Sequence, residues 1–197
     1  MYCIKRIIRN ERVRELGWLF WILFLVVIVQ RLIELLVAAR NGRTLRSLGG
    51  YEVGGDHYKY LVIIHLFFFM SWWVEVVIGQ PTIPEWWMVP LGLFILAQVV
   101  RGWVMFTLGP YWNTRIYVVP GMRPVKKGPY RLFRHPNYLV VIVEMMTLPL
   151  VFGAWFTALA PTLLNLIFLL KVRIPIEEQA LEEAVHSTIP SSTRSAK

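Results

Sequence analysis

Long apolar runs constrain this chain more than any other feature of its sequence. The first run covers residues 16–39, and a helix of that length reaches about 36 Å, enough to cross about 30 Å of hydrocarbon. Residues 60–78 and 86–108 form two further runs of comparable length. We therefore predict an integral membrane protein in which residues 16–108 contain three transmembrane helices.

Composition and charge support this prediction. Hydrophobic residues make up 56% of the chain and charged residues only 17%, whereas soluble chains average roughly 25% charged residues. The net charge of +9 is compatible with a membrane protein, since Lys and Arg mark cytoplasmic helix ends and contact anionic lipid. We expect membrane lipids as partners and no nucleic acid. The single cysteine, Cys3, excludes an internal disulfide and a cysteine-based metal site.

The second half of the chain has a different pattern. Residues 109–137 are polar, basic and rich in Gly and Pro, and two apolar runs follow at 138–152 and 155–170. Each run is slightly short for a span, which favours a tilted helical hairpin within a unit covering residues 109–184. The predicted fold class is all-α integral membrane, with about five transmembrane helices.

The two ends of the chain are expected to differ from the bundle. Residues 1–15 are basic and are predicted to form an interfacial segment on the membrane surface. Residues 185–197 are rich in Ser and Thr and are predicted to be a disordered tail.

Positive charge gives the bundle an orientation. In a bundle of five helices, the segments after the first, third and fifth helices lie on one side, and the turns on the opposite side carry no Lys or Arg. The basic residues are Arg40, Arg43, Arg46, Lys59, Arg115, Arg123, Lys126, Lys127, Arg131, Arg134, Lys171 and Arg173. This side is predicted to be cytoplasmic. The basic residues of segment 1–15 would then lie outside, against the usual rule.

Two polar clusters converge on that side, at opposite ends of the predicted hairpin. Residues 128–138 place aromatic, cationic and imidazole groups directly before a membrane helix. Beyond the last span, Arg173 precedes Glu177 by four residues, a spacing at which the two side chains can meet on one helix face. Such a place can bind a charged cofactor from the cytosol and a lipophilic substrate from the bilayer.

With these motifs the chain resembles the isoprenylcysteine carboxyl methyltransferase family of membrane enzymes. The resemblance covers approximately residues 98–183 and rests on the run 128–138, the apolar hairpin, and Arg173 with Glu177 and Glu178. The N-terminal half is similar to the bacterial branch, some of whose members are encoded beside type III polyketide synthases and are thought to O-methylate alkylpyrones and alkylresorcinols. The residues behind that similarity are Gln30, Arg31, Glu34, Leu35, Asn41, Leu45, Gly49, Glu52, Val53, Gly54, His57, Tyr58 and His65.

The resemblance implies a function and a set of site residues. The enzyme would use S-adenosylmethionine to methylate an oxygen of a lipophilic or prenylated substrate, with Arg173 facing the reacting group and Glu177 facing the cofactor as the catalytic pair. The implied cofactor-binding residues are Met122, Arg123, Pro124, Val125, Tyr130, His135, Pro136, Asn137, Tyr138 and Glu177. Arg115 stands where family members often carry Gln. Met122 and Pro124 replace more polar residues of the eukaryotic branch, which counts against a prenylcysteine acceptor, and the similarity of the N-terminal half to the bacterial branch favours a phenolic or pyrone lipid.

Other ionisable residues lie at membrane depth, where they are unfavourable unless paired or near a helix end. Arg31 and Glu34 are spaced by three and are interpreted as a structural or snorkelling pair, while Glu144 is close enough to Tyr138 to reach the cofactor. Glu75 and Arg101 lie at similar depth. No metal is expected, because the histidines lack a matching ligand set.

Two other functions remain open at this point. One is a membrane reductase of the sterol or steroid type that uses NADPH, since some of these enzymes have a similar C-terminal hairpin. The other is a small, non-enzymatic membrane transporter. The gathering of polar residues at one end speaks against a transporter, because transporters place broken helices and a site near mid-membrane.

Overall fold

The computed structural model describes the backbone of residues 2–186 and the side chains of residues 17–185. Most of it is helical. Five helices form the bundle: α1 (Tyr2–Ser47), α2 (Gly55–Trp73), α3 (Met88–Leu108), α4 (Pro136–Leu150) and α5 (Trp155–Phe168). A sixth, α6 (Ile174–His186), follows α5 after the π-helical turn η4 (Leu169–Arg173). Between the helices lie the strands β1 (Tyr51–Val53) and β2 (Ile116–Val118) and the short helices η1 (Val74–Ile78), η2 (Gly109–Tyr111) and η3 (Gly128–Arg131).

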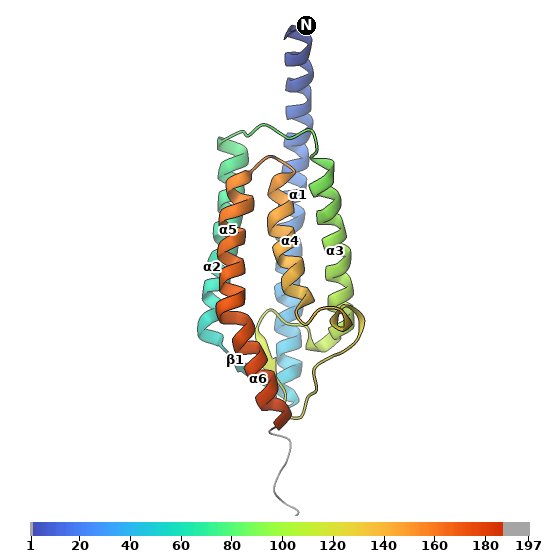
Figure 1. Cartoon of the computed structure of the whole chain (residues 1–197), viewed down its shortest axis with the longest axis vertical. Helices are drawn as coiled ribbons and strands as arrows, with labels where there is room; N and C mark the ends of the chain where they lie inside the picture. Colours follow the sequence, from blue (N-terminus) through green and yellow to red (C-terminus); the bar gives the residue numbers. More distant parts are fainter. Residues whose placement is uncertain (1, 187–197) are drawn as a thin grey trace, which may run out of the picture.

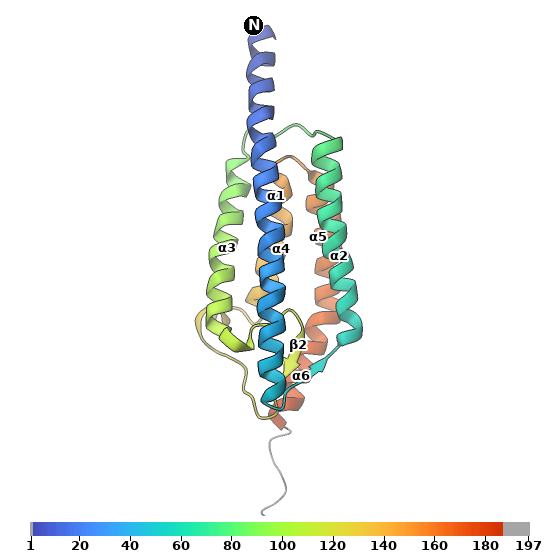
Figure 2. The same cartoon turned by 180° about the vertical axis from the view of Figure 1, so that it is seen from behind.

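The five long helices stand side by side, and their connections gather at the two ends of the bundle (Figures 1 and 2). The strands, η3 and α6 all lie at one end, which we call the loop end. The N-terminal part of α1 projects beyond the bundle at the other end. The three basic segments predicted to share one side therefore do lie at one end, and the start of α1 lies at the opposite one.

Length and hydropathy mark the chain as an integral membrane protein. Among the described residues, four helical stretches are long and apolar enough to cross a bilayer: Gly17–Ser47, Gly55–Ile78, Met88–Tyr111 and Trp155–Val185. Helix α4 has only 15 residues, a length of about 22 Å, and is shorter than the roughly 30 Å of hydrocarbon. All five predicted helices are thus present, and four of them have the length of a span.

Some boundaries differ from the predictions. The basic residues 2–15 were predicted to form a separate interfacial segment. In the structure they continue without a break into the first span, as one helix from Tyr2 to Ser47. That helix also continues eight residues beyond the predicted end at residue 39, into what was expected to be a loop. Residues 185 and 186 end α6, and the remainder of the predicted disordered tail, 187–197, lies outside the described residues.

A cluster of large aromatic side chains forms the core of the bundle near the end opposite the loops. Trp72 of α2 is fully buried, and Phe20 of α1 meets it edge to face at 5.2 Å. Phe152, at the turn between α4 and α5, also packs edge to face on Phe20 at 5.4 Å. Edge-to-face pairs add to the benefit of burial. This cluster joins α1, α2 and the hairpin.

The predicted hairpin of α4 and α5 is present, and η1, which directly follows α2, holds its turn in place. Gly153 adopts a positive φ of 73° in the turn, where a side chain would collide with the carbonyl of Thr82. The Glu75 carboxylate accepts hydrogen bonds from the backbone N–H groups of Phe156 and Thr157, at 3.0 and 2.8 Å. A carboxylate at a helix N-terminus satisfies otherwise unpaired N–H groups and complements the helix dipole.

At the loop end, β1 and β2 form an antiparallel ribbon in which Glu52 pairs with Tyr117. Buried residues of β2 pack against α6, through Ile116 and Val118 on the strand and Ala180 on the helix. The ribbon therefore ties the loop after α1, the loop after α3 and the C-terminal helix into one structure. This connection places the polar clusters of the sequence beside each other.

Candidate active site

Tyr138 connects the two catalytic residues predicted from the sequence. Pro136 occupies the first turn of α4, where its missing N–H costs nothing, and Tyr138 follows in that turn. The Tyr138 hydroxyl donates to the Glu177 carboxylate and accepts a 3.1 Å hydrogen bond from Nε of Arg173. Arg173 and Glu177 are therefore joined through the Tyr138 hydroxyl, and not by the direct pair that their spacing predicted.

Arg173 is held firmly at the inner side of this group. Its side chain lies at the end of η4 and the residue is only 5% exposed. A second hydrogen bond joins Nη2 to the carbonyl oxygen of Thr114, in the loop before β2, at 2.8 Å. A guanidinium has five N–H donors, so two bonds leave donors for a ligand in the cavity that Arg173 lines.

His135 covers the outer side of the same group. Its ring stacks on Tyr138 with the ring centroids 5.5 Å apart and an interplanar angle of 17°. Nε2 lies 3.2 Å from a carboxylate oxygen of Glu178, and Nδ1 lies 3.8 Å from one of Glu177. The predicted residues His135, Tyr138 and Glu177 are thus brought together, with two carboxylates beside one imidazole.

The remaining predicted cofactor residues do not all lie beside Tyr138 and Glu177. Burial raises the pKa of the Tyr130 hydroxyl and the Glu177 carboxylate adds to this shift, so Tyr130 is a neutral phenol facing the acid. Met122, Arg123, Pro124 and Val125 lie in the loop before η3, which bonds to α6 through Gly121 N and the Ala184 carbonyl at 3.2 Å. Within the described part of the chain, no hydrogen bond or ion pair joins these four residues to Tyr138 or Glu177.

A cavity of about 400 Å³ begins beside this group and extends between the helices. Asn137, Tyr138 and Arg173 line its loop end, and apolar side chains of α1 and α2 line much of the rest. Asn137 presents a buried Oδ1 that has no hydrogen-bond partner among the described residues. A buried acceptor without a partner is unusual in a folded protein and indicates a place where a ligand can donate.

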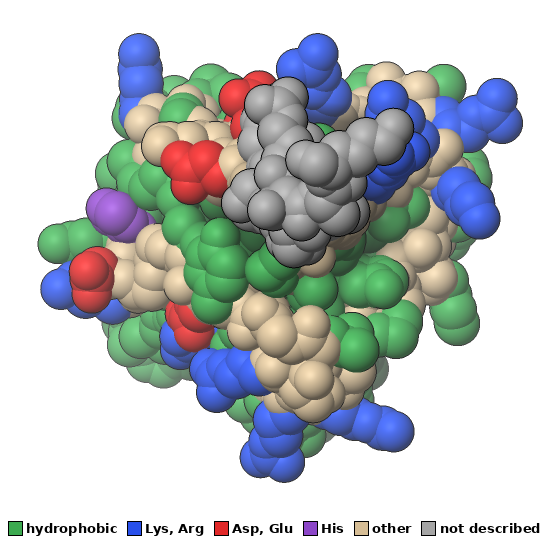
Figure 3. Space-filling model, turned by 90° about the horizontal axis from the view of Figure 1, so that it is seen from below, with side chains coloured by type: hydrophobic (Ala, Val, Ile, Leu, Met, Phe, Trp, Pro, Cys, Tyr) green, Lys and Arg blue, Asp and Glu red, His purple; other side chains and the backbone are tan. Residues whose placement is uncertain are grey.

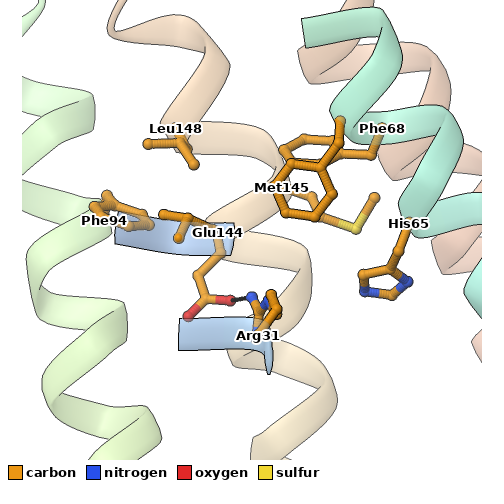
Figure 4. Close-up of a pocket in the computed structure, with 9 residues that line it drawn as sticks. Arg31, His65, Phe68, Phe94, Glu144, Met145 and Leu148 are labelled. Atoms are coloured by element: carbon orange, nitrogen blue, oxygen red, sulfur yellow. Dashed lines mark hydrogen bonds and ion pairs between the residues drawn. The ribbon is translucent and has the colours of Figure 1, made fainter. Parts of the chain in front are cut away.

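A network of buried charges lies deeper in the bundle. The predicted pair of Arg31 and Glu34 is confirmed, with a 2.6 Å contact. Arg101 of α3 contacts both Glu34 and Glu144, and Arg31 lies 2.5 Å from Glu144 (Figure 4). Glu144 is therefore satisfied inside the bundle and does not reach toward Tyr138. Gln30 and Gln98 complete the network with hydrogen bonds of 2.8–2.9 Å.

Arg115, which stands where family members often carry Gln, has its own partner on the ribbon. Its guanidinium lies 2.6 Å from a carboxylate oxygen of Glu52 and 4.3 Å from the ring centroid of Tyr58. The hydrogen bond to Glu52 raises the pKa of Arg115. Arg115 thus fastens β1 and the start of α2 to the loop that holds Arg173.

Three features of this region were missed by the sequence reasoning: the Thr114 carbonyl, the network through Arg101, and Asn165, a polar residue inside an apolar span. Asn165 gave the clearest signal, since an amide at membrane depth requires partners. The Thr114 carbonyl gave none, because any residue carries one.

Comparison with known proteins places the chain in a class. The isoprenylcysteine carboxyl methyltransferase (ICMT) family matches residues 89–183, which include nearly all of α3, the strand β2, η3, the hairpin and most of α6. The chain belongs to this family and is a membrane methyltransferase of its type. Methyltransferases of this family generally use S-adenosylmethionine.

Two bacterial proteins are similar over most of their length. YpbQ of Bacillus subtilis (strain 168), described as uncharacterized, is 41% identical over 165 residues, covering 84% of this chain and 98% of that protein. An uncharacterized protein of Haemophilus influenzae (strain ATCC 51907 / DSM 11121 / KW20 / Rd) is 27% identical over 161 residues, covering 81% of this chain and 93% of its own. No solved structure matches this chain.

Proposed function

We propose that this protein is an S-adenosylmethionine-dependent O-methyltransferase that acts on a lipophilic acceptor. The observation that carries the proposal is the position of the group formed by Arg173, Tyr138 and Glu177, at the polar end of a cavity of about 400 Å³ between membrane helices. A charged cofactor and an oily acceptor need such an arrangement, because one arrives from water and the other from lipid.

The residues of the site suit the cofactor. Glu177 has 27% of its side chain exposed and can accept hydrogen bonds from an ammonium group. The stacked rings of His135 and Tyr138 offer aromatic surface to a sulfonium or an adenine. Asn137 presents an acceptor that lacks a partner. When bound, S-adenosylmethionine supplies a methyl group that is activated toward displacement.

Positioning and exclusion of water are the contributions of the chain. The acceptor oxygen would take the methyl group from bound S-adenosylmethionine and displace the neutral thioether, and a phenol or enol acceptor would first release its proton to water and react as the anion. Arg173 can hold the oxygen in its anionic form with donors not used by Thr114 and Tyr138. The apolar cavity keeps water from competing as the nucleophile.

The acceptor is proposed to enter from the bilayer between α1 and α2. Leu32 of α1 and Leu66 of α2 line the cavity and are 56% and 64% exposed, so apolar surface continues from the cavity to the outside of the bundle. An alkyl chain can follow this surface. The similarity of residues 30–65 to the bacterial branch favours a phenolic or pyrone lipid over a prenylcysteine carboxylate as the acceptor.

The loop end is proposed to face the cytoplasm, where the cofactor is made. Figure 3 looks onto this end and shows Lys and Arg side chains around its rim. Positive charge of this kind marks the cytoplasmic side of membrane proteins. The N-terminus of α1 would then lie outside, and the short α4 would complete five crossings through local thinning of the bilayer.

Transfer of a labelled methyl group tests the proposal and separates the two acceptor classes. Purified protein is incubated with methyl-labelled S-adenosylmethionine and either an alkylresorcinol or a prenylcysteine, and the lipid extract is then treated with mild alkali. Label that stays on the alkylresorcinol is expected, because an aryl methyl ether resists alkali. Volatile label released only from the prenylcysteine would show a methyl ester and overturn the acceptor assignment. No transfer to either lipid would contradict the O-methyltransferase.

A further inference from the structure

Asn165 is the most unusual buried side chain in the described part of the chain. It belongs to α5, it is 0% exposed, and it lines the cavity. Neither its amide nitrogen nor its carbonyl oxygen has a hydrogen-bond partner among the described residues. Burial of an amide without partners is unfavourable, and a buried polar group of this kind normally finds one. A molecule in the cavity can supply both partners at once.

His65 presents a second polar group to the same cavity. Its Nδ1 lies 2.8 Å from the carbonyl oxygen of Leu61, and a carbonyl only accepts, so Nδ1 carries the hydrogen. In the neutral ring Nε2 is then an acceptor. His65 lines the cavity from α2 and Arg31 lines it from α1. Figure 4 shows both side chains where they border a smaller neighbouring pocket.

The two side chains lie at similar depth, well away from the group around Arg173. His65 is seven residues beyond Tyr58, whose hydroxyl contacts Thr114 at the level of Arg173. Asn165 precedes Arg173 by eight residues on α5, which packs beside α2. At 1.5 Å per residue, both positions are roughly 10–12 Å deeper in the membrane than the loop end. The inner end of the cavity is therefore polar where an alkyl chain alone would be expected.

The charge around this inner end selects for a neutral ligand group. Arg31 and Arg101 are matched by Glu34 and Glu144 within one network, so the sum of these four charges is zero. A carboxylate or phosphate placed there would remain without a counter-charge, which is costly at this depth. A hydroxyl or carbonyl carries no such cost.

We propose that the inner end of the cavity is a recognition subsite for a second, uncharged oxygen group of the acceptor, bound by Asn165 and His65. A hydroxyl there donates to His65 Nε2 and accepts from the Asn165 amide, and a carbonyl uses the Asn165 amide alone. This inference rests on the proposed function and narrows its substrate class to lipids whose alkyl chain carries a neutral oxygen group roughly 10–12 Å from the oxygen that is methylated. A pure hydrocarbon tail, such as a prenyl chain, would leave both side chains without partners.

Equilibrium binding of two matched lipids tests the subsite without the methyl donor. A tritiated long-chain alkylphenol that carries a hydroxyl part-way along its chain, at the depth of Asn165, is compared with the alkylphenol of the same chain length without that hydroxyl. The wild-type protein in detergent should bind the chain-hydroxylated lipid about five- to tenfold more tightly, the effect of one or two hydrogen bonds. Asn165→Leu should bring the ratio of the two dissociation constants close to one by weakening binding of the chain-hydroxylated lipid.

Thr162→Val is the matched control. Thr162 lies on the same helix, is buried and has an unpartnered hydroxyl, but it does not line the cavity. Its loss should leave the ratio unchanged. If Asn165→Leu does not give folded protein, His65→Phe tests the subsite from α2 and should also lower the ratio.

The outcomes separate the subsite from the proposed function. Equal binding of the two lipids by the wild type, or an unchanged ratio in Asn165→Leu, overturns the subsite even if both lipids are methylated. The subsite is also overturned if Thr162→Val lowers the ratio of the two dissociation constants as much as Asn165→Leu does. Preferential binding of the chain-hydroxylated lipid without any methyl transfer from S-adenosylmethionine keeps the subsite and counts against the methyltransferase proposal.

Discussion

Nε of Arg173 lies 3.1 Å from the hydroxyl oxygen of Tyr138 and donates a hydrogen bond to it. The same hydroxyl donates to Glu177, so one phenol links a buried cation to a partly exposed acid. Methyl transfer by displacement depends on alignment more than on acid–base chemistry. This link is the feature that we expect to fix the positions of acceptor and cofactor relative to each other.

Removal of the linking hydroxyl should impair the reaction and spare the fold. In Tyr138→Phe the ring can still stack on His135, but Arg173 and Glu177 lose their common partner. We expect the methyl-transfer rate to fall on the order of ten- to a hundredfold, since small misalignments have effects of this size. The control is Tyr60→Phe, at a lipid-facing position that is 48% exposed. A wild-type rate in Tyr138→Phe would contradict the role given to the hydroxyl.

Arg173→Lys tests whether the shape of the cation matters. A lysine keeps the charge but cannot bond Thr114, Tyr138 and an acceptor oxygen together with one planar group. We expect kcat to fall about tenfold or more, the loss of one hydrogen bond to a charged group, with little change in the dissociation constant of S-adenosylhomocysteine. Lys171→Ala, two residues away and exposed, should behave like wild type. Unchanged turnover in Arg173→Lys would remove Arg173 as the residue that holds the acceptor.

His135→Ala should weaken cofactor binding selectively. The ring lies at the entrance of α4, stacked on Tyr138, and is 17% exposed, so its loss should not unfold the bundle. We expect the dissociation constant of S-adenosylhomocysteine to rise about three- to tenfold. Arg134→Ala is the matched control, since the Arg134 side chain is 89% exposed and 3.7 Å from Glu178. Equal affinity in wild type and His135→Ala would place His135 outside the cofactor site.

The charge network makes a prediction about stability. Arg101→Met leaves Glu144 with one partner fewer and the network with a net negative charge, and removal of one member of a buried pair costs about 3–5 kcal/mol. The double variant Arg101→Met, Glu144→Met restores neutrality and keeps the pair of Arg31 and Glu34. Thermal melting in detergent should rank the double variant above either single variant. Additive destabilisation would show that the charges are not coupled.

Sequence patterns predicted the helices well because membrane spans are defined by hydropathy over many residues. They did not predict that α1 runs on to Ser47, since residues 40–47 are polar and their helix is held by tertiary contacts. One such contact is the 2.7 Å hydrogen bond from Asn41 to the Trp112 carbonyl. The ribbon was also missed, because three-residue strands paired across more than sixty positions leave little local signal.

In the candidate site, too, local sequence motifs were predicted and contacts between distant helices were not. Arg173, Glu177, His135 and Tyr138 were found because they form compact motifs, and the structure brings them together. The partner of Glu144 depends on how three helices are rotated about their axes, which spacing along one helix does not reveal. Its place beside Arg101 therefore became evident only in the folded chain.

Direct binding of the cofactor's demethylated product tests the central claim most directly. Purified protein is titrated with S-adenosylhomocysteine and separately with NADPH, and the melting temperature is followed together with the heat of binding. We predict saturable binding and a higher melting temperature with S-adenosylhomocysteine, reduced in His135→Ala, and no change with NADPH. Stabilisation by NADPH, with none by S-adenosylhomocysteine, would contradict the methyltransferase and favour a membrane reductase.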